Sequence, residues 1–150
     1  MGKYRKFLLM IFVSTVIMYG MMFLNVFSFT HIHISVTRIL MALMMGAAMA
    51  IIMLLFMWQM YPSKKKNGLI LVISAVIFVA SLFMVRTQTG VSDISWMKAM
   101  IPHHSIAILT STEADLKDPE VKKLAHKIIK TQKKEIKEMN QMIERLQEKD

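Results

Sequence analysis

Residues 39–60 read ILMALMMGAAMAIIMLLFMWQM, a run of 22 positions without a charged side chain. At a helical rise of about 1.5 Å per residue, this run is long enough to cross a hydrocarbon core of roughly 30 Å. The composition agrees, because 55% of the 150 residues are hydrophobic and the mean hydropathy is positive. We therefore interpret the chain as an all-α membrane protein.

Two further uncharged runs flank this one, at residues 7–29 and 69–85. Basic residues precede the first run, as in a signal peptide, but the run is too long for a signal h-region and no small-residue cleavage site follows it. We expect it to remain as a membrane span. The predicted organisation is a three-span region over residues 1–85, a linker over residues 86–91 and a helical domain over residues 92–150.

The distribution of basic residues predicts the orientation of the spans. Six Lys/Arg lie at the N-terminus and in the 61–68 turn, against two, Arg38 and Arg86, near the opposite ends of the spans. The positive-inside rule then places the N-terminus in the cytoplasm and residues 86–150 outside it. The formal net charge of +9 is thus a topology signal and does not indicate a nucleic-acid partner.

Methionine is abundant in this chain, with 17 residues, and cysteine is absent. Disulfides, thiolate metal sites and thiol nucleophiles are therefore excluded. In the span at residues 39–60, a methionine ridge recurs at every fourth position: Met41, Met45, Met49, Met53 and Met57. The ridge could pass a soft Cu(I) or Ag(I) ion between thioethers. We prefer the interpretation that methionine fills space in a helix that packs through Gly46 and its neighbouring alanines.

Residues 92–150 predict two amphipathic helices that fold back as an antiparallel hairpin. Ser92 is a suitable N-cap for the first helix, and Asp118 followed by Pro119 is a specific start signal for the second. The apolar stripe of the second helix is interrupted by Gln132 and Glu135. Because a buried carboxylate without a partner is costly, we expect Glu135 to meet a cation, a hydrogen-bond donor or water.

The first helix of this hairpin contains WMKAMIPHHSIA at residues 96–107. At about 100° per residue, Met97, Met100 and His104 fall within an arc of about 60°, whereas His103 lies about 100° from His104. A fold-back about residue 115 predicts that Met97 lies opposite Glu135 and that His104 lies nearer Ala125 and Ile128.

Sulfur, imidazole and carboxylate groups would then converge between the two helices. The candidate metal ligands are Met97, Met100, His103, His104, Glu135, Met139 and Met142. His31 and His33 are weaker candidates, since a His-x-His pair in an extended segment points both rings the same way.

The pattern Asp93-x-x-Trp96-x-x-x-Met100-Ile101-Pro102-His103-His104-x-x-Ala107, followed by Leu124-Ala125, Ile129, Gln132, Glu135-Ile136 and Met139, resembles the domain of unknown function 305 family. The resemblance covers about residues 92–146. It implies a ferritin-like helical fold and copper or silver handling outside the bacterial cytoplasm. It also implies Met100, His103, His104 and Met139 as ligands.

This chain departs from the family at Leu109 and Thr110, which stand where members usually have an acidic residue and a methionine. Its helical domain is also shorter than the soluble region of many members. We therefore expect the hairpin to complete a helical bundle by pairing with a second copy or with a membrane partner.

Our first functional hypothesis is membrane-anchored binding of Cu(I) or Ag(I), for sequestration or for relay to a metal-handling protein. Thioether and imidazole ligands suit a soft monovalent ion in an oxidising compartment. The alternative is a non-catalytic assembly module of the lipid bilayer in which the His/Met motif is structural. An enzyme is not indicated, since the sequence has no Glu-x-x-His pair, nucleotide-binding loop or hydrolase nucleophile motif.

Overall fold

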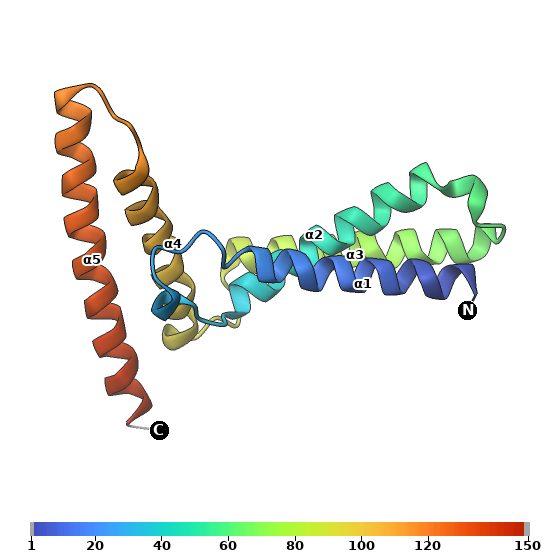
Figure 1. Cartoon of the computed structure of the whole chain (residues 1–150). Helices are drawn as coiled ribbons and strands as arrows, with labels where there is room; N and C mark the ends of the chain where they lie inside the picture. Colours follow the sequence, from blue (N-terminus) through green and yellow to red (C-terminus); the bar gives the residue numbers. More distant parts are fainter. Residues whose placement is uncertain (1, 149–150) are drawn as a thin grey trace. The chain divides into compact units, whose positions relative to one another are not determined.

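The computed structural model describes residues 2–148, and its regular elements are all helical (Figure 1). Within these residues the chain forms two compact units. Unit 1 comprises the residues up to Met21 together with Thr37–Gly90, and unit 2 comprises Met22–Val36 together with the residues from Val91 onward. The elements are α1 (Lys3–Met21), η1 (Phe29–His31), α2 (Val36–Phe56), η2 (Trp58–Met60), α3 (Lys64–Thr87), α4 (Asp93–Glu113) and α5 (Pro119–Gln147).

Three helices, α1, α2 and α3, are long and apolar enough to cross a membrane, with 19, 21 and 24 residues. Their bounds differ from the predicted spans, because α1 ends at Met21 rather than near residue 29 and α3 begins at Lys64 rather than at residue 69. Hydropathy identifies residues that hydrocarbon tolerates, whereas backbone hydrogen bonding decides where a helix ends. Lysines in a first helical turn can also extend toward water.

Unit 1 packs most closely where α1 meets α2. A Cβ atom added at Gly46 would overlap the side chain of Thr15, so the two helices approach each other at this glycine. Ala47 and Ala50 are buried beside it, while the methionines of the ridge are only partly buried. Burial of small residues supports the packing interpretation of this span.

In unit 2, α4 and α5 pack through a shared apolar core (Figure 1). The predicted register is wrong: His104 pairs with Glu135, whereas a tight fold-back about residue 115 would bring it near Ile128, seven positions earlier. The connection causes this shift, because Ala114 and Asp118, at its two ends, are both extended. Extended residues rise about 3.3 Å each, against about 1.5 Å in a helix, so α5 begins well beyond the end of α4.

Pro102 lies inside α4, which is assigned as one continuous helix from Asp93 to Glu113. The Asp118 side chain caps α5 by accepting the backbone N–H groups of Glu120 and Val121 at 2.8 and 2.9 Å. The predicted start of α5, with Asp118 as cap and Pro119 at the first position, is thus confirmed.

The segment Met22–Val36 packs against α4 within unit 2. Ser105 Oγ accepts the Phe27 N–H at 2.7 Å and is hydrogen-bonded to His31 Nδ1 at 2.9 Å, and the Ser105 side chain has no solvent exposure. Near the other end of the segment, Ser95 Oγ accepts the Val36 N–H at 3.3 Å. The sequence predicted a span and a short connection here. It did not predict that this segment packs against α4.

This packing can be compared with the order of the candidate spans. The segment Met22–Val36 and the helices α4 and α5 belong to one unit, and in the chain they are separated by α2 and α3. Two of the three helices that are long and apolar enough to cross a membrane therefore lie between two parts of the same unit.

The substitution Gly46→Ala is expected to lower the melting temperature of the full chain in detergent, because the added methyl would overlap Thr15 Oγ1. Overpacking of this kind costs about 1–3 kcal/mol. The matched control is Gly68→Ala in α3, where no atom lies within 4 Å of the added methyl. Its melting temperature should stay the same or rise. The double variant Thr15→Ala/Gly46→Ala should recover most of the loss, and a double variant no more stable than Gly46→Ala would contradict the close approach.

The substitution Ser105→Ala is expected to release the segment Met22–Val36, because it leaves the Phe27 N–H without its acceptor. A buried donor without a partner costs about 1–3 kcal/mol. Hydrogen–deuterium exchange should therefore accelerate at Phe27. Thr110→Ala is the control, since that exposed hydroxyl bonds only to carbonyl groups of its own helix. Equal protection of Phe27 in both variants would show that Ser105 does not hold the segment.

Candidate metal-binding site

The centre of the candidate site is a contact between His104 on α4 and Glu135 on α5. His104 Nε2 lies 2.9 Å from Glu135 Oε2, and the two side chains are 16% and 42% exposed. On its other side, His104 Nδ1 lies 2.9 Å from the Met100 carbonyl oxygen, one helical turn earlier. The structure thus gives Glu135 a contact on α4, and His104 is the group that faces its carboxylate.

The two contacts of His104 define the chemistry of its ring. A carbonyl oxygen only accepts hydrogen bonds, so Nδ1 carries the hydrogen. The neutral ring would then direct the Nε2 lone pair at a carboxylate oxygen, which also accepts. The contact between Nε2 and the carboxylate oxygen is favourable only when a proton or another cation lies between the two atoms. A ring nitrogen fixed by a backbone carbonyl is also the usual support of a histidine metal ligand.

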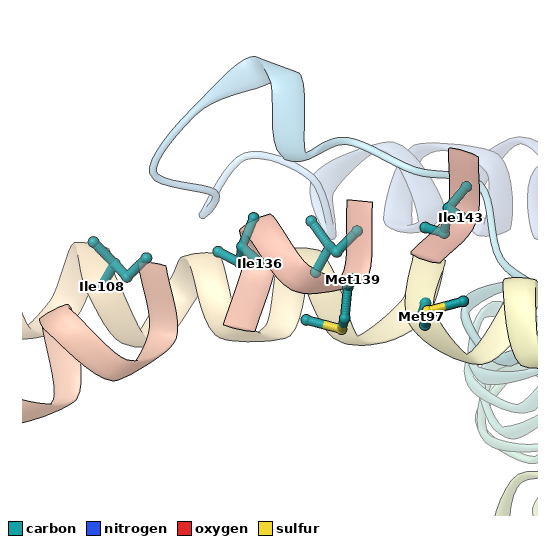
Figure 2. Packing of buried hydrophobic residues seen from close by; sticks show 6 residues of the cluster. Met97, Ile108, Ile136, Met139 and Ile143 are labelled. Carbon is teal, nitrogen blue, oxygen red and sulfur yellow. The ribbon is translucent and has the colours of Figure 1, made fainter. Parts of the chain in front are cut away.

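Three of the predicted methionine ligands lie in or against the apolar core. Met97 and Met139 are 4% and 7% exposed and form part of this core with four isoleucines, and Met100 packs against it. Figure 2 shows Met97 and Met139 among the labelled isoleucines between α4 and α5. Their thioethers are thus shielded from water.

Two other predicted ligands are on the solvent side. His103 is exposed, as its divergence from His104 on the helix predicts. Met142 is 45% exposed although it shares the apolar stripe of α5. A histidine at the surface remains free to contact a second ion or a partner chain.

The two weaker candidates, His31 and His33, belong to the segment that packs on α4. Burial lowers the pKa of the His31 imidazole. The pKa of His33 is lowered first by burial and then by the positive charges of Lys98 and His31. Both rings therefore favour the neutral form, and His33 Nε2 is buried without a hydrogen-bond partner.

Ser105 is the residue that the sequence reasoning missed. It follows Ile101 by four positions and precedes Ile108 by three, which places it on the buried stripe of α4. A buried hydroxyl needs a hydrogen-bond partner, either a carbonyl of its own helix or a group from elsewhere, and here the segment Met22–Val36 provides two contacts. The spacing of Ser105 was therefore the available signal.

Beside Ser105, unit 2 has a hollow of about 250 Å³. Its walls include Phe27, His31 and Lys133, and Lys133 Nζ lies 5.5 Å from the centre of the Phe27 ring. In residues 2–148, no group of three or more His, Asp and Glu side chains is arranged to hold a metal ion. A metal site around His104 would therefore depend on methionine sulfur to complete its ligands.

Comparison with known proteins supports the family resemblance that the motif indicates. Residues 84–150 match the family described as Domain of unknown function (DUF305). The family resemblance drawn from the motif is thereby confirmed for this part of the chain, which contains His104 and Glu135.

An uncharacterized protein of Acanthamoeba polyphaga mimivirus is 35% identical over 96 residues, which cover 63% of this chain and 62% of the viral protein. The similar stretch is longer than residues 84–150, so it extends into the region of the candidate spans. The chain spans less than two thirds of the length of that relative. No solved structure matches the chain.

Proposed function

We propose that the α4–α5 pair binds a soft metal ion, Cu(I) or Ag(I), for sequestration or relay by a membrane-anchored protein. The observation that carries this proposal is the environment of His104. Its Nδ1–H is fixed by the Met100 carbonyl, and its Nε2 faces the Glu135 carboxylate. The site thus presents an imidazole lone pair and a negative charge to one incoming cation.

The neighbouring donors support a soft ion. Met100 precedes His104 by one helical turn and is partly buried, and Met97 and Met139 belong to the apolar core between the same two helices. Thioether and imidazole are preferred by Cu(I) and Ag(I), and a chain without cysteine offers no thiolate. Glu135 would act as a ligand or as the counter-ion, and His103 would serve a second ion or a partner.

A second candidate function is a non-catalytic assembly module. The near-complete burial of Met97 and Met139 favours it, because core packing alone accounts for both side chains. In this case the helix pair would complete a bundle with a second copy or a membrane partner, and chelators would leave the oligomer intact.

The location of the site is part of the proposal. We place residues 86–150 outside the cytoplasm of a bacterial cell, since six Lys/Arg lie near the N-terminus and the 61–68 turn against two near the opposite ends of the spans. An oxidising compartment favours thioether over thiol ligands for copper handling.

Titration of the full chain in detergent with Cu(I), against a competing chromogenic chelator, tests the function. Replacement of His104 by alanine is expected to lower the affinity roughly 10- to 100-fold, because it removes the central nitrogen donor. Met100→Leu keeps the volume of the side chain and should weaken binding by removing only the sulfur.

The matched control for this titration is His126→Ala. His126 is exposed, and its Nδ1 lies 2.8 Å from the Lys122 carbonyl, so it has the same backbone contact as His104 without a carboxylate partner. Its loss should not change the affinity. Unchanged binding in the triple variant Met100→Leu/His103→Ala/His104→Ala would refute the site, and a metal-independent oligomer would then favour the assembly module.

Cysteine labelling tests the orientation, since the chain has no cysteine of its own. Lys127→Cys on the exposed surface of α5 should react with a membrane-impermeant maleimide in intact cells. Lys65→Cys, in the first turn of α3, should react only after the cells are permeabilised. The reverse pattern would place α4 and α5 in the cytoplasm and contradict extracytoplasmic metal handling.

A further inference from the structure

One end of unit 1 concentrates positive charge. The N-terminus of α1 and the turn before α3 lie at the same end of the unit (Figure 1). They contribute six exposed basic side chains: Lys3, Arg5, Lys6, Lys64, Lys65 and Lys66. Unit 1 contains no Asp or Glu, so no carboxylate of this unit neutralises them. Three of the lysines stand in the first turn of α3, where the helix dipole is also positive, which favours a bound anion.

A network of hydrogen bonds holds this cationic end together. The Tyr4 hydroxyl accepts the Ser63 N–H at 3.0 Å and donates to Asn67 Oδ1 at 2.8 Å. Asn67 Nδ2 in turn donates to the Tyr61 carbonyl at 3.1 Å, and the Asn67 side chain has no solvent exposure. The α1 terminus is therefore fixed to the turn by partly buried polar contacts.

One lysine from each segment contacts the other segment. Lys66 Nζ lies 5.4 Å from the centre of the Tyr4 ring, and Lys3 Nζ donates to the Met60 carbonyl at 3.4 Å. The rings of Tyr4 and Tyr61 are 5.2 Å apart, centre to centre. Tyrosine and lysine in this combination are typical of the interface between hydrocarbon and headgroups.

An apolar groove of about 450 Å³ begins next to this cationic end. Leu8 and Leu69 line its near part, two positions after Lys6 and three after Lys66. The groove continues between α1, α2 and α3 as far as Ile77. Since these three helices are the candidate spans, the groove would lie at the depth of lipid acyl chains.

We propose that this end of unit 1 binds one anionic phospholipid. The lysines at the start of α3 and the basic residues at the start of α1 hold its phosphate headgroup, and one acyl chain lies in the groove that begins at Leu8 and Leu69. A zwitterionic lipid has the same phosphate but adds an ammonium group, which the six cations repel. The site therefore selects for a net negative headgroup, and it is independent of any metal bound by unit 2.

Native mass spectrometry of the full chain, titrated in detergent with phosphatidylglycerol or phosphatidylcholine of identical acyl chains, tests the headgroup site. The protein should bind phosphatidylglycerol roughly tenfold or more tightly than phosphatidylcholine. Lys64→Gln/Lys65→Gln/Lys66→Gln should remove most of this preference. The control Lys122→Gln/Lys123→Gln/Lys127→Gln removes the same charge from the exposed surface of α5 and should keep it. Equal preference in the two triple variants would overturn the proposal.

Two further measurements test whether the bound phosphate belongs to a lipid with an acyl chain in the groove. Ile73 is a groove residue that is 49% exposed, so Ile73→Trp fills the groove without disturbing a core. This variant should bind both lipids at least several-fold more weakly, and unchanged binding would overturn the acyl-chain part of the site. An excess of inorganic phosphate should leave phosphatidylglycerol bound. Complete displacement would identify a site for free phosphate and overturn the lipid proposal.

Discussion

Hydrocarbon offers no hydrogen-bond partner to a peptide group, and this constraint shapes the whole chain. A segment that crosses a membrane must satisfy its backbone internally, and the three candidate spans α1, α2 and α3 are continuous helices of 19, 21 and 24 residues. In the chain, α2 and α3 separate the segment Met22–Val36 from α4, against which it packs. The buried hydroxyl of Ser105 depends on that arrangement, because its partners Phe27 and His31 come from this segment.

The cationic end of unit 1 can be explained by the same constraint. Charged side chains are costly in hydrocarbon, and six of the basic residues of unit 1 lie at the start of α1 and the start of α3. A partly buried hydrogen bond between Tyr4 and Asn67 joins the start of α1 to the start of α3. The resulting positive surface is complementary to a phosphate headgroup, and the apolar groove beside it is complementary to an acyl chain.

The site in unit 2 depends on a backbone contact as much as on its side chains. The Met100 carbonyl places the hydrogen of His104 on Nδ1 and leaves Nε2 to face Glu135. Helical periodicity correctly separated His104 from the exposed His103 and correctly gave Glu135 a partner. It could not identify that partner, because periodicity describes one helix at a time. The register between α4 and α5 depends on the extended connection after Ala114, whose rise per residue is about twice that of a helix.

The sequence by itself determined three apolar helices, the cap at Asp118 and the motif that matches residues 84–150 to a known family. These features are local, since they depend on hydropathy over a single run or on spacing along a single helix. Tertiary structure alone decided that α1 ends at Met21, that the following segment packs on Ser105 and that His104 meets Glu135. Each of these involves groups far apart in the chain, and the free energy of burying or pairing them depends on which surfaces meet.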